Sequence, residues 1–383
     1  MSYIQVESGD FDIGVPLRRS LYNKDGILLI KEGGILGSEQ HRDILFENGV
    51  FCYDEPGEEQ WISPLEQESD DEGNPFAQLD NAKIKLKRAF DLFRKNNAHE
   101  EFLPRIRGVA LLLQLACDED QDAALANLHL DYDTPYDVLH HLEAAVLCEI
   151  IGKHLKVSEK SRFQLVNAGL THDISLLDIQ HVLDRQILPL SDKELERIRD
   201  HPKDSAQLLR GLGVTDKSWL DAVEHHHERL DGSGYSDSLA GDGIRVSTQI
   251  LAIADIYSAM IRDRPQRKAI LSKEAMRSLL MEHAGQHDAR LTQILIKELG
   301  VFPPGLIVRL ATGEITVVKQ REGSGATPIV YAFIDPDGMP MTTPERRETA
   351  SPGNRIKSIL PFSRVRSCFP IIRSLWMHSA VQV

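Results

Sequence analysis

The sequence predicts a mainly α-helical protein with a small β-rich module on each side of the helices. Between residues 80 and 300, apolar residues recur at helical spacing, as in KIKLKRAFDLFRKN and PRIRGVALLLQLA. Before them, short apolar runs at 27–30 and 50–53 lie between Asp-Gly and Gly-Gly turns, which is typical of strands. After residue 300, VFPPGLIVRLATGEITVVKQ contains two alternating runs separated by Thr312-Gly313, which indicates a β-hairpin.

These changes of pattern divide the 383 residues into five parts. We expect a β-rich N-terminal module (1–65), an acidic linker (66–79), a helical domain (80–300), a small β module (301–350) and a basic tail (351–383). The linker begins with EQESDDEGNP, which is polar, acidic and closed by Pro. The tail carries five basic residues and no acidic one, and a solvated or self-docked tail is favoured over one that lies on an anionic membrane or partner.

Composition excludes several classes of protein. The net charge of −14 argues against a binder of nucleic-acid polymers, so an anionic ligand needs a local positive site. Four scattered cysteines without a CxxC pair predict neither a disulfide framework nor a cysteine zinc site. No signal peptide and no transmembrane segment of about 20 apolar residues is visible, and we expect a cytoplasmic protein.

Histidines concentrate in one part of the predicted helical domain. Of the 15 histidines, nine fall between residues 140 and 227: His140, His141, His154, His172, His181, His201, His225, His226 and His227. Because imidazole is the commonest metal ligand in proteins, this crowding on a helical scaffold suggests a metal site.

The first two of these histidines are adjacent on one predicted helix, YDVLHHLEAAVLCEIIGKHL. His140 lies on an apolar stripe opposite Glu149, Lys153 and Lys156, which we place on the outward face. His141 heads a second apolar stripe. Helical periodicity does not choose between the two as a ligand, and either one alone also suits a satisfied core position.

Two further positions combine histidine with a local structural signal. His172 and Asp173 follow a mostly apolar helix, and a carboxylate beside an imidazole can bridge a pair of metal ions. A helix C-cap with a turn is the alternative interpretation of this pair. His201 is followed by Pro202, a residue typical of the first helical turn, which predicts His201 as an N-cap.

The strongest local signals come next along the chain. Three histidines in succession, His225 to His227, cannot all share one helix face, but two can reach adjacent metals. The following turn, Asp231 to Gly234, offers backbone amides to an anion. Asp255 is the only charged residue from 246 to 261, and a buried carboxylate of this kind needs a proton, hydrogen bonds or a cation.

Together these residues resemble the HD-GYP family, a branch of the HD metal-dependent phosphohydrolases. The resemblance runs from about residue 136 to 267. It rests on the pair His172-Asp173, on HHERLDGSGYS (226–236) in the place of the family's HHExxDGxGYP, and on ADIYSAMIRDRPQR, which in the family carries a late metal-binding Asp. The spacing between the candidate ligands suits the family without large gaps.

This resemblance implies an HD-type helical bundle that holds two divalent or mixed-valence metal ions, iron or manganese. It implies seven ligands, with Asp173 bridging and with His140 selected over His141: His140, His172, Asp173, His201, His226, His227 and Asp255. It implies catalytic roles for His172 and Asp173, and substrate contacts from Gly234, Tyr235, Arg264 and Arg267. The implied reaction is hydrolysis of cyclic di-GMP to pGpG or GMP, by a hydroxide between metals about 3.5 to 4 Å apart.

Four departures from the family pattern stand in this sequence. Ser175 and Leu176 replace the Gly and Lys of HDIGK, and the missing Lys is expected to weaken catalysis or substrate binding. Ser236 replaces the Pro of GYP, which we expect to loosen a turn. Tyr136 stands where trinuclear members have Glu, so a dinuclear centre is expected.

Three functions remain open from the sequence. A cyclic di-GMP phosphodiesterase is favoured because all seven ligand positions are filled. A degenerate receptor that binds metal and cyclic dinucleotide with little turnover is favoured by the loss of the Lys. The third is a phosphohydrolase acting on another substrate. The expected partners are cyclic di-GMP and either a second copy of the chain or a signalling protein.

Overall fold

The computed structural model describes residues 3–6, 17, 21–22, 28–30, 50–53, 74–95, 99–180, 190–262, 270–281, 283–322 and 326–377. The chain forms two compact units, residues 1–67 and residues 68–383. Among the described residues, no helix combines the length and the apolar character that a membrane crossing requires.

The first unit contains a small antiparallel sheet. Its strands are β1 (Tyr3–Val6), β2 (Leu21–Tyr22), β3 (Leu28–Ile30) and β4 (Val50–Tyr53), in the order β1-β4-β2-β3. β1 and β4 pair in register from Tyr3 opposite Tyr53 to Val6 opposite Val50. β3 and β4 therefore lie within the predicted strands at 27–30 and 50–53, of which residue 27 is outside the described residues.

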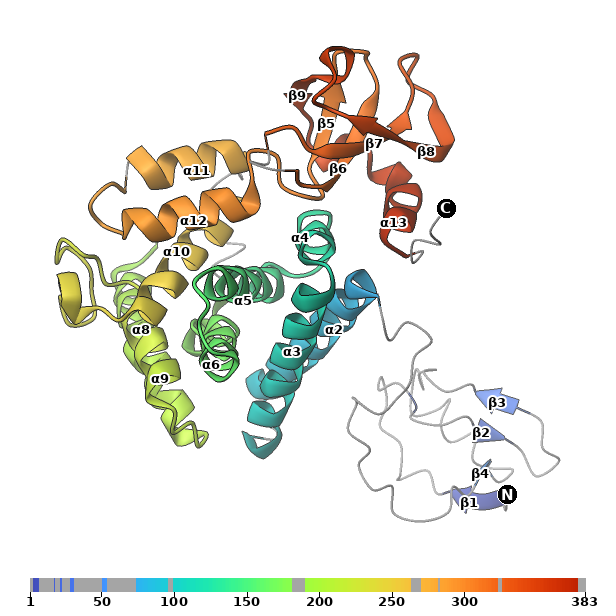
Figure 1. Cartoon of the computed structure of the whole chain (residues 1–383). Helices are drawn as coiled ribbons and strands as arrows, with labels where there is room; N and C mark the ends of the chain where they lie inside the picture. The colour runs from blue at the N-terminus through green and yellow to red at the C-terminus, as the bar shows by residue number, and fades with distance from the viewer. Residues whose placement is uncertain are drawn as a thin grey trace. The chain divides into compact units, whose positions relative to one another are not determined.

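The second unit is built on helices, as the sequence predicts (Figure 1). They are α2 (Pro75–Arg94), α3 (His99–Glu119), α4 (Gln121–His129), α5 (Tyr136–His154), α6 (Glu159–Gly169), α8 (Asp192–Gly211), α9 (Lys217–His225), α10 (Val246–Met260), α11 (Ser272–Met281) and α12 (Ala289–Leu299), with a 3-10 turn, η2 (Ile174–Leu176), after α6.

α2 begins inside the predicted linker. The side-chain oxygen of Asn74 accepts hydrogen bonds from the backbone N–H groups of Phe76 (2.9 Å) and Ala77 (3.1 Å), and Pro75 occupies the first helical position. Pro fits there because its missing N–H would have no helical partner. The Pro that closes the acidic run therefore starts the first helix, and residues 75–79 are helical rather than linker.

α5 is the central helix of this unit, and α3, α4, α6, α10 and α12 all contact it (Figure 1). Every residue from Asp137 to Gly152 is buried, so the helix has no outward face there. The placement of Glu149 on an outward face was therefore wrong. Its carboxylate accepts from Arg162 Nε (2.8 Å) and Gln114 Nε2 (2.9 Å), and these partners allow it to be buried.

α6 packs unusually close to α5. A Cβ on Gly169 would lie 2.8 Å from the Cα of Ala145, so only glycine fits at this contact. Gly169 is the last residue of α6, and His172 follows three residues later. The close contact therefore brings the His172-Asp173 turn directly against the helix that carries His140.

The C-terminal part is larger than the hairpin that the sequence predicts. Its five antiparallel strands are β5 (Ile307–Leu310), β6 (Ile315–Gln320), β7 (Ile329–Ile334), β8 (Pro340–Glu348) and β9 (Ile356–Ile359), in the order β8-β7-β6-β5-β9. β5 and β6 form the predicted hairpin, and Gly313 in its turn has a φ of +99°. β9, which pairs with β5, comes from the predicted tail.

The rest of the described tail also docks on the protein itself. Its helix α13 (Phe369–Met377) places Trp376 against Phe76, with ring centroids 5.5 Å apart. Arg366 pairs with Asp133, and Arg373 pairs with Asp80 at 2.8 Å. Two of the tail's cations are therefore matched by carboxylates of the same chain.

Candidate metal centre

All seven predicted ligands lie in one cluster, in which Asp173 and His227 are half-buried and the other five are buried. Five segments contribute to it. α5 supplies His140, and the turn after α6 supplies His172 and Asp173. α8 supplies His201, the end of α9 supplies His226 and His227, and α10 supplies Asp255.

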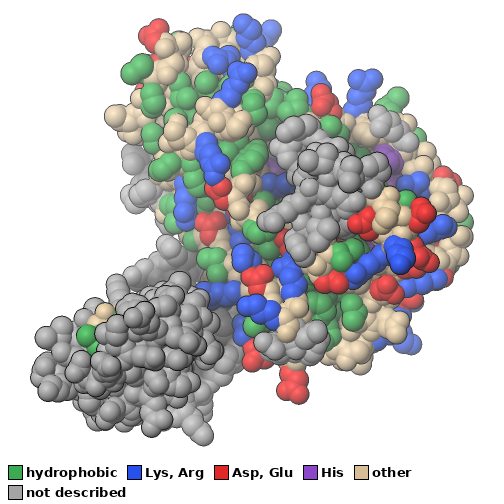
Figure 2. Space-filling model, turned by 180° about the vertical axis from the view of Figure 1, so that it is seen from behind, with side chains coloured by type: hydrophobic (Ala, Val, Ile, Leu, Met, Phe, Trp, Pro, Cys, Tyr) green, Lys and Arg blue, Asp and Glu red, His purple; other side chains and the backbone are tan. Residues whose placement is uncertain are grey.

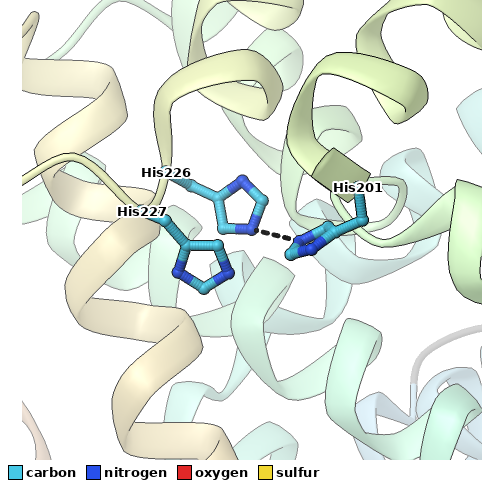
Figure 3. A group of neighbouring side chains, drawn as sticks. All are labelled: His201, His226 and His227. Carbon is cyan, nitrogen blue, oxygen red and sulfur yellow. Dashed lines mark hydrogen bonds between the residues drawn. The ribbon is translucent and has the colours of Figure 1, made fainter. Parts of the chain in front are cut away.

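The first donor group consists of three imidazoles, His201, His226 and His227 (Figure 3). One ring nitrogen of each lies within 4.8 Å of the others. The Nε2 atoms of His201 and His226 are 3.2 Å apart, and the rings of His226 and His227 have centroids separated by 4.2 Å. We call these residues the imidazole group.

The second donor group combines two imidazoles with a carboxylate: His140, His172 and Asp255. His140 Nε2 lies 3.3 Å from His172 Nε2 and 3.1 Å from Asp255 Oδ1. All three residues are buried. We call them the mixed group.

Asp173 lies between the two groups and faces both. Its Oδ1 is 2.9 Å from His201 Nε2 and 3.6 Å from His226 Nε2, which belong to the imidazole group. Its Oδ2 is 3.7 Å from His172 Nε2 and 3.9 Å from His140 Nε2, which belong to the mixed group. One carboxylate thus offers an oxygen to each group, as a ligand that bridges two metals must.

Backbone carbonyls fix the orientation of three of the rings. The Nδ1 atoms of His172, His201 and His226 each bond to the carbonyl of the residue three positions earlier: Gly169 (2.8 Å), Ile198 and Val223 (2.7 Å). A carbonyl only accepts hydrogen bonds, so each Nδ1 carries the proton and each Nε2 presents a lone pair to the cluster. His140 is held instead by a side chain, because its Nδ1 lies 3.0 Å from Ser258 Oγ, which itself donates to Asp255 O (2.9 Å).

This arrangement fits a cation. Lone pairs that face one another at 3.2 to 3.3 Å repel unless a positive charge, a metal ion or a proton, lies between them. Imidazole nitrogens and carboxylate oxygens are together the usual donors for divalent first-row transition metals. Every donor that the two groups present is therefore of a type that such metals take.

The carbonyl that holds His201 is available because of the following proline. Pro202 lies inside α8, so the prediction that His201 is an N-cap was wrong. In a regular helix the N–H of residue 202 would bond to the carbonyl of Ile198, and proline has no N–H. That carbonyl accepts from His201 Nδ1 instead. The absence of an N–H at Pro202 therefore leaves the Ile198 carbonyl free to orient the His201 ring.

The electrostatics of the cluster also demand positive charge. Burial lowers the pKa of His172, but the carboxylates of Asp173 and Asp255 outweigh it and raise that pKa to about 9. Burial raises the pKa of Asp173, but the imidazoles of His172 and His201 outweigh it and hold that pKa well below its usual value. Burial likewise raises the pKa of Asp255, but His140 and His172 outweigh it and hold that pKa well below its usual value. Both carboxylates are thus ionised, and a metal that binds beside them displaces protons from the imidazoles.

Glu228 organises the loop beside the imidazole group, a role that sequence reasoning missed. Its buried carboxylate accepts from the backbone N–H groups of Ser236 (2.9 Å), Asp237 (2.6 Å) and Leu239 (3.0 Å). The available signal was an acidic residue just before a glycine-rich turn, whose free amides need an acceptor. Gly234 closes the same loop, because a Cβ there would lie 2.5 Å from Arg229 N and Glu228 Cα.

Tyr235 and Ser236 follow in this loop. The Tyr235 ring stacks on His227 with centroids 4.8 Å apart, which places it at the edge of the imidazole group. The sequence predicted that Ser236 would loosen the turn, but the structure shows that it does not. Its N–H donates to Glu228, and its hydroxyl donates to Glu224 O at 2.9 Å. A proline could make neither bond, so serine fastens the loop in a different way.

The other departures from the family motif lie close to the centre. Leu176 is buried, and its N–H donates to Asp173 O at 2.9 Å. Ser175 Oγ donates to His201 O (3.1 Å) and accepts from Ser205 Oγ (2.9 Å), which links the His172-Asp173 turn to α8. The Tyr136 ring stacks on His140, with centroids 5.2 Å apart.

Three residues singled out from the sequence fall outside the described residues. Arg264 and Arg267, expected to hold phosphates or guanines, lie between residues 263 and 269. His181 lies between residues 181 and 189.

Comparison with known proteins places this cluster in context. Residues 123–291 match the model of the HD domain family. The chain is 30% identical over 214 residues to the cyclic di-GMP phosphodiesterase PA4108 of Pseudomonas aeruginosa, which covers 56% of this chain and 51% of that protein. It is 31% identical over 174 residues to the 3'3'-cGAMP-specific phosphodiesterase 3 of Vibrio cholerae, and this match covers 45% of this chain and 38% of that protein. It is 25% identical over 228 residues to the cyclic di-GMP phosphodiesterase PdeB of Borreliella burgdorferi (59% and 60%). The matches thus span about 40 to 60% of these relatives' lengths.

Proposed function

We propose, from the premise that this chain belongs to the HD domain family through residues 123–291, that it is a metal-dependent phosphodiesterase which hydrolyses cyclic di-GMP to pGpG or GMP. The observation that carries the proposal is Asp173, whose two oxygens face two separate donor groups. Such a bridging carboxylate suits a pair of metals better than a single structural ion.

The two donor groups would hold one cation each, with iron or manganese as the proposed metals. Divalent cations bound in this way neutralise phosphate charge and lower the pKa of water to near neutrality. The chain's own part is to fix the donor atoms, through the carbonyls of Gly169, Ile198 and Val223 and through Ser258 Oγ. Preorganised donors of this kind need no rearrangement during the reaction.

The centre also supplies the positive site that an anionic substrate needs on an acidic protein. Figure 2 shows Lys and Arg side chains interspersed with Asp and Glu over the described part of one face. The ion pairs of the chain include Arg197 with Asp178 and Arg210 with Glu224. We propose that the cations at the centre, with Arg264 and Arg267, receive the phosphates, and that Tyr235 and Gly234 line the substrate side of the imidazole group.

Two alternatives each have an observation in their favour. Leu176 leaves no ammonium group at the family's Lys position, which favours a receptor that binds the dinucleotide with little turnover. The relative in Vibrio cholerae that acts on 3'3'-cGAMP favours this closely related substrate. A homodimer or a signalling partner, and a cytoplasmic location, stay predictions from the sequence.

A turnover assay on the full chain tests the proposal. The protein, loaded anaerobically with Fe(II) or Mn(II), is given cyclic di-GMP and 3'3'-cGAMP in parallel, and wild type is compared with Asp173→Ala. Asp242→Ala removes an exposed carboxylate and serves as the control. We expect pGpG or GMP from wild type and from the control, and none from Asp173→Ala. Tight binding of cyclic di-GMP without product would favour the receptor, and faster turnover of 3'3'-cGAMP would change the substrate.

A further inference from the structure

His141 has the same local design as the ligands of the centre, although the family pattern gives it no role. It follows His140 on α5 and is 2% exposed. Its Nδ1 lies 2.5 Å from the carbonyl of Asp137, one turn earlier, so Nδ1 carries the proton and Nε2 presents a lone pair. Among the described residues, this buried Nε2 has no hydrogen-bond partner.

The His141 ring lies against the His172-Asp173 turn. The centroids of the His141 and His172 rings are 4.7 Å apart, and donor atoms of His141, His172 and Asp173 all lie within 4.8 Å of one another. On its other side the His141 ring packs edge-on against Phe90, with centroids 5.1 Å apart. The ring is thus held between the core and the donor cluster.

A purely structural role does not explain this ring. A buried nitrogen that has left water and gained no hydrogen-bond partner destabilises a protein. A leucine would fill the same space without an unsatisfied atom. His141 is therefore better explained by a partner that the chain itself does not provide.

We propose that His141 is an eighth metal donor. The cation of the mixed group then has two alternative binding positions: the first seat, formed by the mixed group itself, and a second seat, formed by His141, His172 and Asp173. His172 belongs to both sets of three donors, and its one free lone pair serves one cation at a time. The second seat is therefore an alternative position for the same cation, and the total stays at two. The ligand class is a divalent first-row transition metal, which accepts this mixture of imidazole and carboxylate. The inference rests on the proposed dinuclear centre.

Two alternative seats for one cation predict a specific pattern of metal affinities in a double-mutant cycle of His140 and His141. When His140→Ala removes the first seat, the cation keeps the second through His141. When His141→Ala removes the second seat, the first remains intact. Only the double variant lacks both, so its loss of affinity exceeds the product of the two single losses, which is the mark of coupled sites.

Equilibrium titration with Mn(II), followed by the EPR signal of the free ion, measures this pattern without any activity assay. We expect the affinity for Mn(II) to fall less than about 3-fold in His141→Ala, about 10-fold in His140→Ala and roughly 1000-fold or more in the double variant. The last value is large because even the loss of an outer partner of a ligand lowers metal affinity by about 10- to 100-fold. His154→Ala, on the same helix but paired with Glu298, is the control and should match wild type. Thermal melting of the chelated proteins tests folding, and His141→Leu should melt no lower than wild type.

Equal affinity for His140→Ala and the double variant would overturn the second seat and leave His141 as a core residue or the partner of a buried water. The outcome is separable from that of the proposed function. Two bound cations and turnover without the mutant pattern would refute only the second seat. The mutant pattern without turnover would refute only the phosphodiesterase.

Discussion

The imidazole group and the mixed group both face Asp173, but their donors differ in charge and in how they are oriented. The imidazole group contains no carboxylate of its own, and two of its rings, His201 and His226, are locked by backbone carbonyls. The mixed group contains the buried Asp255, and its His140 is locked only by a side chain, Ser258. We therefore expect ring orientation to control metal affinity at the imidazole group, and charge to control metal affinity at the mixed group.

The largest effect is expected from removing the charge of the mixed group. Asp255→Asn keeps the shape but takes away an anionic donor 3.1 Å from His140 Nε2. We expect metal affinity at the mixed group to fall by roughly 100-fold or more, a larger loss than for His140→Ala, because the lost carboxylate charge also lies 3.6 Å from His172 Nε2, a donor of both seats. Isothermal titration with Mn(II) checks this, with Asp242→Asn as the exposed control. A loss equal at both positions would mean that the groups do not differ in charge dependence.

Ring orientation in the imidazole group can be altered without touching a ligand. Pro202→Ala restores an N–H that competes for the Ile198 carbonyl, so His201 loses part of its orienting bond. We expect about 10-fold weaker metal binding at this group, the low end of the range for outer partners. Thermal stability should be unchanged or higher, because alanine suits a helix interior better than proline.

Pro104→Ala is the matched control, since Pro104 also lies inside a helix, α3, that carries no predicted ligand. It should change stability in the same direction and leave metal binding as in wild type. If both variants weaken metal binding equally, the carbonyl of Ile198 has no special role.

An effect of similar size, but on turnover rather than on metal binding, is expected in the loop that carries Tyr235. Ser236→Pro removes the bonds to Glu228 and Glu224 O, and Ser236→Ala removes only the second. Each bond contributes about 1 kcal/mol to stability, and displacement of Tyr235 should reduce turnover roughly 10-fold in the proline variant. Metal content should stay at the wild-type level. A rise in turnover on introducing the family's proline would contradict this account of the loop.

The smallest effect concerns the entry to α5 and depends on pH. Burial raises the pKa of Asp131, but the ammonium of Lys83 and hydrogen bonds from Thr134 outweigh it and lower the pKa to about 2. Because the folded value lies below the unfolded one, the stabilisation is complete above about pH 4 and is lost as the pH falls towards 2. Asp131→Asn should therefore lower stability by about 1 kcal/mol at pH 7, after discounting for partial exposure.

Urea unfolding of Asp131→Asn and wild type at several pH values checks this prediction. The difference between the two proteins should narrow below pH 4. A difference that stays constant down to the acid limit would show that the Lys83 pair does not act through charge.

The sequence predicted which residues meet better than how they are held. The motif around His172-Asp173 and the run at His226 and His227 identified separate segments that do converge. The hydrogen bonds to Gly169, Ile198 and Val223 depend on where each helix ends or lacks an N–H, which residue spacing does not reveal. Periodicity also could not separate His140 from His141, because α5 is buried on every side.

The C-terminal part shows the same limit for strands. The alternating runs of β5 and β6 were visible because each carries its own pattern. β9 is short, and it is a strand only because β5 offers a free edge, so its basic residues suggested a tail.

The most direct test of the central claim is the metal content and magnetic coupling of the purified protein. Wild type and Asp173→Asn are loaded anaerobically with Mn(II), desalted and examined by elemental analysis and low-temperature EPR. We predict two metals per chain and a spin-coupled signal in wild type, and loss of both in Asp173→Asn. A single metal in wild type, or an unchanged coupled pair in Asp173→Asn, would contradict a dinuclear centre bridged by this carboxylate.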